Sequence, residues 1–224
     1  MGLTIEFLGH SGFLLAGSEA CVAVDPFLEG NPVATRKCAD VRCDFIALTH
    51  GHADHMGDAK AIAKANGATV VAAWEICEYL AGEGVATDPG NPGGRITTPF
   101  GWIAFTQAFH SSSFQGQYMG QPCGLVIHFN AENFTFHHLG DTALFGDLKL
   151  IGSLYRPDVS AIPVGDRFTM NCEQGSMAAE MIGPKVAIPI HWGTFPVLAQ
   201  DVSGFRPKGV EVKVMKPGEV WQAR

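Results

Sequence analysis

Closely spaced cysteine pairs are missing from the sequence, which has six scattered cysteines in 224 residues and no Cys-x-x-Cys motif. Thiolate zinc sites and the disulfide frameworks of small secreted proteins need regularly spaced cysteines, so reduced thiols are expected here. A run of about 18 apolar residues, as a membrane span requires, is missing too, and no basic leader precedes an apolar stretch at the start. We therefore expect a cytoplasmic protein without a membrane partner.

Positive charge is scarce. Lys and Arg total 15 against 22 Asp and Glu, which gives a net charge of -7. This balance disfavours a broad surface for nucleic acid, so a small-molecule substrate is the expected partner, and a homo-oligomer stays open. Hydrophobic residues make up 46% of the sequence, enough for a substantial core, and we predict one domain over residues 1–224.

The hydrophobic pattern gives strands first and then alternating strands and helices. One helix is expected from about Asp54 to a stop at Asn66-Gly67, and another from about Ala143. The Gly- and Pro-rich stretch 87–101 is expected to be a loop. Further strands are predicted at 3–9, 12–27 (a hairpin), 44–49, 68–73, 102–109, 124–129, 133–138, 159–164, 185–190 and 210–215, with helices at 74–81 and 173–183. Two β-rich halves, each with helices, predict an α+β fold of two sheets packed face to face with helices outside.

Histidine is concentrated in "THGHADHMGD", residues 49–58. In an extended segment residues i and i+2 point the same way, so His50 and His52 can bind one metal ion. Asp54 and His55 lie just beyond, where they can face a second ion. Imidazole and carboxylate suit zinc, iron or manganese. The competing interpretation is a helix start capped by Asp54 with solvated histidines, but four ligand-type residues in six positions argue against it.

Three further ligand candidates each follow an apolar strand. They are His110 before "SSS", Asp141 in "GDT" and His191 in "HWGTFP". Sites on sheets of this kind form where strands end. A single His or Asp in this position would be interpreted as an ordinary loop residue. Because the same context occurs three times, we favour a ligand role for each of the three.

These motifs, with "LGHSGF", "DPFLEGNP", "GDTALFGDLKLIG" and "PVGDRFTM", resemble the metallo-β-lactamase superfamily over nearly the whole chain. The nearer resemblance is to the UPF0173 metal-dependent hydrolases, related to the bacterial L-ascorbate-6-phosphate lactonases. It implies a four-layer αβ/βα sandwich, the metallo-β-lactamase fold, with a dinuclear site at one edge of the sheets. The implied ligands are His50, His52 and His110 for one ion and Asp54, His55 and His191 for the other, with Asp141 bridging. Antibiotic hydrolysis is not expected, because Asp141 stands where the β-lactamases carry Cys.

The resemblance implies a hydrolase with two divalent ions, zinc first and manganese or iron as alternatives. A hydroxide bridging the ions, oriented by Asp54 as the catalytic carboxylate, would attack a small anionic ester, phosphodiester or lactone. The alternative is a metal-binding sensor or scaffold without significant hydrolysis. Branch motifs also suggest ligand-orienting roles for His10, Asp25, His138 and Asp166, with ordinary buried or strand-end roles equally open. Core packing is the default for Trp192 and Phe195, a solvated helix face for Lys149, and His137 receives no role.

Overall fold

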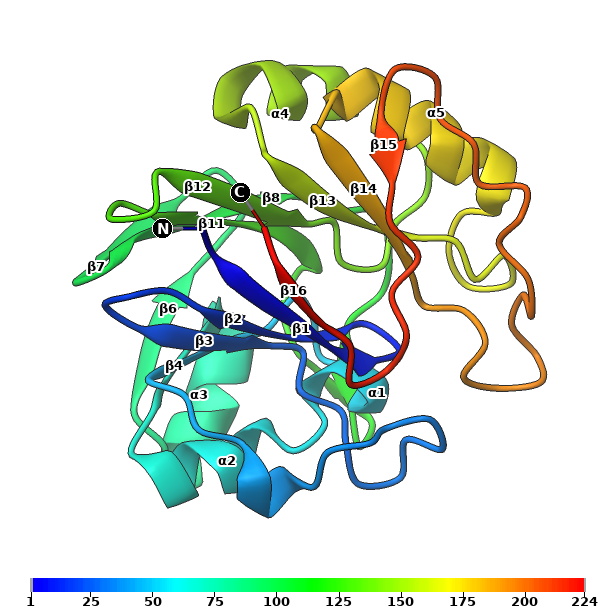
Figure 1. Ribbon diagram of the computed structural model, residues 1–224. Helices are drawn as coiled ribbons and strands as arrows, with labels where there is room; N and C mark the ends of the chain where they lie inside the picture. Colours follow the sequence, from blue (N-terminus) through cyan, green and yellow to red (C-terminus); the bar gives the residue numbers. More distant parts are fainter. Residues whose placement is uncertain (1, 224) are drawn as a thin grey trace.

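Two seven-stranded sheets pack face to face in the computed structural model, which describes residues 2–223 (Figure 1). The first has the order β16-β1-β2-β3-β4-β5-β6 and the second β15-β14-β13-β12-β11-β8-β7. The first sheet contains β1 (Thr4–Gly9), β2 (Gly12–Ala16), β3 (Cys21–Val24), β4 (Phe45–Ala47), β5 (Thr69–Ala73), β6 (Thr87–Gly90) and β16 (Val220–Gln222). The second contains β7 (Arg95–Thr98), β8 (Gly101–Gln107), β11 (Cys123–Phe129), β12 (Phe134–His138), β13 (Val159–Pro163), β14 (Val186–Ile190) and β15 (Glu211–Val212). A short hairpin, β9 (Ser113–Phe114) and β10 (Gln117–Tyr118), stands apart from both.

Helices cover the outer faces of both sheets. In Figure 1, α2 and α3 lie below the first sheet, and α4 and α5 lie above the second. The helices are α1 (Ala53–Met56), α2 (Ala59–Asn66), α3 (Trp74–Gly82), α4 (Leu148–Tyr155) and α5 (Cys172–Ile182), with a 3-10 turn at Cys38–Asp40. The predicted four-layer αβ/βα sandwich is therefore confirmed. Within residues 2–223, none of these helices combines the length and hydropathy needed to cross a bilayer.

Alternation along the strands builds three apolar layers. Phe13 of β2 and Phe136 of β12 meet between the sheets with ring centroids 5.2 Å apart. Neighbouring residues of a strand point to opposite faces of the sheet. Ile46 of β4 therefore packs against α2 and α3, and Ile162 of β13 packs against α4 and α5. Burial of both faces explains why the central strands read as nearly continuous apolar runs.

Four expectations about the elements were wrong in detail. The helix predicted from Asp54 breaks at Gly57, where φ is +41° and a Cβ atom would lie 2.5 Å from the carbonyl oxygen of Pro26. The predicted loop 87–101 contains β6 and β7. The helix expected near Ala143 begins only at Leu148. The closing strand at 210–215 is reduced to β15, and β16 pairs with β1 instead.

Strand direction brings the candidate residues to one edge of the sandwich. Strands β3 to β6 are parallel to one another, as are β12 to β15. The carboxyl ends of parallel strands share an edge, and His50, Asp141 and His191 all follow such ends.

Candidate metal centre

Three histidines form the first group at this edge. His50, His52 and His110 each offer a ring nitrogen, and these atoms lie within 4.8 Å of one another. The Nε2 atom of His50 is 3.0 Å from Nδ1 of His52. His50 and His52 belong to the turn after β4, whereas His110 follows β8 of the other sheet. The two sheets thus meet at this group.

Asp141 lies between this group and a second one. Its carboxylate oxygens are 3.6 Å from Nε2 of His110, 3.4 Å from Nε2 of His55 and 3.0 Å from Nε2 of His191. The side chain is almost completely buried. A carboxylate between ring nitrogens of both groups has the position that a bridging ligand needs.

The second group consists of Asp54, His55 and His191, and it also contains His10. Oδ2 of Asp54 is 3.8 Å from Nε2 of His191 and 3.1 Å from Nε2 of His10. Asp54 is the exposed member, since 31% of its side-chain surface is open to solvent. All seven predicted ligands therefore lie together. His10 also offers a ring nitrogen within 4.8 Å of the ligand atoms of Asp54, His55 and His191.

Asp25 binds the ring nitrogen of His55 that faces away from Asp141. The carboxylate is fully buried at the end of β3, and Nδ1 of His55 donates to its Oδ2 atom at 2.7 Å. Thr49 donates to the same carboxylate through its backbone N–H at 2.9 Å and its hydroxyl at 2.6 Å. These bonds fix the His55 tautomer and leave its Nε2 directed at Asp141.

His138 acts through the backbone rather than on a ligand side chain. Its Nε2 donates to the carbonyl oxygen of Ser11 at 2.8 Å, and its Nδ1 accepts the N–H of Gly140 at 3.0 Å. Gly140 directly precedes Asp141, and its φ of +63° forms the turn. His138 thereby ties this turn to the first sheet.

The structure does not bring Asp166 to the cluster. Its side chain is exposed and lines a separate cavity with Asn171 and Cys172. The backbone of the same loop is what approaches the site: a Cβ on Gly165 would lie 2.2 Å from the carbonyl oxygen of His191. The ligand-orienting role suggested for Asp166 therefore has no contact to support it in the described residues.

Comparison with known proteins gives the family. The β-lactamase superfamily domain model matches residues 4–191. A UPF0173 metal-dependent hydrolase of Geobacillus thermodenitrificans (strain NG80-2) is 44% identical over 97% of this chain and 98% of its own length. One from Carboxydothermus hydrogenoformans is 40% identical over 97% of this chain and 99% of its own. This chain belongs to the UPF0173 metal-dependent hydrolases.

Solved structures agree with this assignment. Igni18, described as a novel metallo hydrolase from the archaeon Ignicoccus hospitalis KIN4/I, is 31% identical and superposes with a TM-score of 0.88 over 99% of this chain and 98% of its own. The metallo-β-lactamase fold protein YhfI from Bacillus subtilis is 16% identical over 99% of each chain, with a TM-score of 0.73, and shows the shared fold. This UPF0173 protein is thus a metal-dependent hydrolase of the metallo-β-lactamase superfamily.

Burial and nearby charges shift the pKa values of most candidate ligands toward the protonation states that bind metal. Burial lowers the pKa of His50, His52 and His110, so these rings are neutral and offer lone pairs at pH 7. Burial acts to raise the pKa of Asp141, but His191 and His55 outweigh it and hold the pKa well below its usual range. The neutral imidazoles of the first group beside this ionised carboxylate are a donor set that suits a divalent cation. The rings of His55 and His191, whose pKa values Asp141 raises, would release a proton when a metal ion binds.

Two buried polar atoms of the cluster that lack hydrogen-bond partners also indicate a metal site. His55 Nε2 and Asp141 Oδ1 are buried, lie 3.4 Å apart and have no hydrogen-bond partner within residues 2–223. Leaving such atoms unpaired costs free energy, about 1–3 kcal/mol for a neutral group and more for a charged one. A cation between them would satisfy both, so the residues of this UPF0173 site fit metal ions.

The backbone is also strained at three residues of the site and at Asp166 outside it. Four of the seven described non-glycine residues with positive φ are His10, Asp25, Asp166 and His191. Such conformations cost of order 1–3 kcal/mol each and persist where the surroundings enforce them. His191 donates its N–H to the carbonyl oxygen of His10 at 2.8 Å, which joins two of these residues across the sheets.

Hydroxyl residues that support the site were not predicted from the sequence. Besides Thr49, Thr194 Oγ1 lies 2.9 Å from Nδ1 of His10, and Thr142 Oγ1 accepts the N–H of Phe109 at 2.9 Å. Each of these residues stands within three positions of a predicted ligand. That spacing was the available signal, but Thr is too common near strand ends for it to be decisive.

Proposed function

We propose that this protein is a dinuclear hydrolase that acts on small anionic esters, phosphodiesters or lactones. One observation carries the proposal. The Asp141 carboxylate lies within 3.6 Å of ring nitrogens of His110 from the first group and of His55 and His191 from the second. A single ion would not need a buried carboxylate between two sets of histidines.

The proposed cofactors are two divalent ions, zinc first, with manganese or iron as alternatives. His50, His52 and His110 would hold one ion, and Asp54, His55 and His191 the other, with Asp141 shared. Bound ions supply a hydroxide nucleophile near pH 7 and polarise the oxygen of the bond to be cleaved. Two divalent ions with two carboxylates and one hydroxide would give the centre a net charge of about +1, which would attract an anion to an otherwise acidic protein.

The chain's own residues then divide the remaining work. Asp54, the most exposed carboxylate of the cluster, would orient the nucleophile. It stays ionised, because the hydrogen bond from His10 at 3.1 Å and the nearby His191 ring outweigh the effect of burial on its pKa. Asp25 and Thr49 keep the His55 ring in position. Six cysteines without disulfides support a reducing, cytoplasmic location, which we also propose.

The test is turnover of bis(p-nitrophenyl) phosphate and a panel of lactones. Wild-type protein, the protein after chelation, and the chelated protein with zinc or manganese restored are compared. Activity should vanish on chelation and return with metal. His52→Ala should lose turnover, whereas the matched variant His128→Ala should keep it, since His128 stacks on Trp102 away from the cluster. Two tightly bound ions without turnover of any substrate would instead favour a metal-binding sensor or scaffold.

A further inference from the structure

An apolar cavity of about 460 Å³ adjoins the metal centre. Its lining includes Val33, Trp192, Val214 and Pro217, with Lys216 as the one lysine or arginine among the lining residues and His10 as a member of the metal cluster. Small-molecule sites in proteins usually have volumes of roughly 300–1,000 Å³ and mostly apolar walls with a few polar groups. This cavity matches that description.

His10 joins the cavity to the site. Its Nε2 atom is 3.1 Å from the Asp54 carboxylate, and its ring centroid is 4.2 Å from that of His191. Trp192, another lining residue, directly follows His191. The cavity and the cluster therefore share the side chain of His10.

Aromatic surface continues around His10. The rings of Phe27 and Phe195 lie 6.0 Å and 5.7 Å from the His10 ring, and both side chains are partly exposed. An apolar substituent of a substrate bound beside Asp54 would thus contact these aromatic rings as well as the cavity. The loop that follows His191 carries both Trp192 and Phe195.

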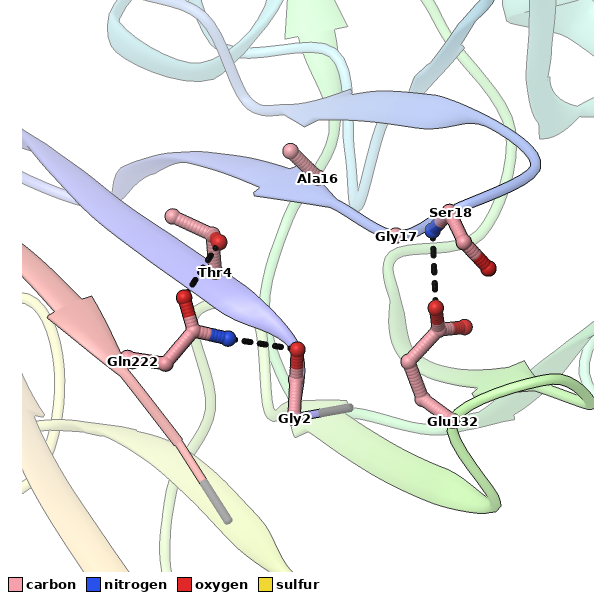
Figure 2. A pocket seen from close by; sticks show the side chains of 7 residues that line it. All are labelled: Gly2, Thr4, Ala16, Gly17, Ser18, Glu132 and Gln222. Carbon is pink, nitrogen blue, oxygen red and sulfur yellow. Dashed lines mark hydrogen bonds between the residues drawn. The ribbon is translucent and has the colours of Figure 1, made fainter.

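A second cavity, shown in Figure 2, has no such connection. It is lined by residues including Thr4, Ser18, Glu132 and Gln222. Thr4 begins β1, whereas His10 follows the end of that strand, so this cavity lies at the opposite end of the sandwich. It contains no residue of the metal cluster.

We infer that the cavity beside His10 binds the apolar arm of the substrate. The inference rests on the proposed function and narrows it to esters or lactones that carry an alkyl or aryl group. About 460 Å³ corresponds to about 15 water-sized groups at about 30 Å³ each, room for an arm of up to roughly ten carbons. A sugar phosphate would find few hydrogen-bond partners in this lining, and burying its hydroxyls unpaired is unfavourable.

The experiment uses γ-lactones whose alkyl side chains lengthen one methylene at a time, with the metal-loaded protein. Each methylene that enters the cavity should raise kcat/KM about fourfold, and the rise should stop once the cavity is filled. Val214→Glu puts a charge at the 47% exposed cavity residue and should flatten this dependence on chain length. Val220→Glu, at a 58% exposed valine of β16 outside the cavity lining, is the matched control and should behave like wild type.

Binding of 1-octanol, followed by calorimetry, gives a readout that needs no turnover. Wild type and Val220→Glu should bind it equally, and Val214→Glu at least tenfold more weakly. Chain-length independence in an active wild-type enzyme, or equal octanol binding by the two variants, would overturn the inference. If no lactone or phosphodiester is hydrolysed at all, the proposed function fails, and the octanol comparison still decides whether the cavity is an apolar binding site.

Discussion

Asp25 is not one of the proposed metal ligands, but its carboxylate orients the ring of His55, which is one. We expect Asp25→Asn to weaken metal binding and to destabilise the metal-free protein. The carboxylate accepts three hydrogen bonds, from Nδ1 of His55 at 2.7 Å and from the N–H and hydroxyl of Thr49 at 2.9 and 2.6 Å. An amide of the same shape has only one acceptor oxygen.

The magnitude follows from those contacts. If the amide oxygen keeps His55, its NH₂ group faces the Thr49 N–H, and a buried donor loses its partner, which costs about 1–3 kcal/mol of unfolding free energy. Loss of the negative charge also makes the His55 ring less basic and less firmly oriented. Changes of this kind beside a metal-binding histidine weaken metal affinity by about 10- to 100-fold.

The assay is competition for zinc with a chromophoric chelator, together with urea unfolding of the metal-free protein. Asp158→Asn is the matched control, because Asp158 accepts the N–H of Thr135 at 2.8 Å and pairs with Lys185, but at the amino ends of β12 and β13. It should lower stability without changing zinc affinity. Wild-type zinc affinity in Asp25→Asn, or an equal loss in both variants, would refute the reasoning.

Three further predictions follow from the cluster. Asp141→Ala should lower both metal content and turnover, as measured by metal analysis and the phosphodiester assay; two tightly bound ions with wild-type turnover would rule out the bridge. His110→Ala and His191→Ala should each retain roughly one ion, and two retained in both would contradict the division of ligands. Burial acts to lower the pKa of His191, but Asp141 and Asp54 raise it to about 9. Metal-free protein should therefore lose about 3 kcal/mol of stability from pH 6.5 to 9 in urea unfolding, and a flat profile would contradict this.

The clustering of the seven candidate ligands could be predicted from the sequence because its signal is local. Four of them share the motif at residues 50–55, and His110, Asp141 and His191 each follow an apolar strand. Asp25 and Asp166 show the limit of this reasoning, since both follow apolar strands in similar motifs. Burial separates them: Asp25 is fully enclosed beside His55, whereas Asp166 is exposed. Nothing within either motif determines which of the two faces the site.

The errors in the elements have a similar cause. Gly57 breaks the predicted helix because Pro26 and Phe27, thirty positions earlier, approach its Cα too closely for any side chain. Strand β6 contains Pro89 and Gly90, whose composition predicts a loop. Gly90 is nevertheless required there, since a Cβ would lie 2.1 Å from the ring of Phe105. Both contacts are long-range, so composition within a short window does not reveal them.

The site is also a junction between the two sheets, and this links its chemistry to the stability of the fold. His10, Asp25 and the 50–55 motif come from the first sheet, whereas His110, Asp141 and His191 come from the second. Backbone bonds already cross there, from Cys123 N–H to the Thr49 carbonyl oxygen at 3.0 Å and from His191 N–H to that of His10 at 2.8 Å. Ions held by ligands from both sides would bind only when the sheets are packed, so their binding free energy adds to that of folding. His10 and His191 have positive φ angles at this junction, so bound metal would also offset backbone strain that the metal-free protein bears alone.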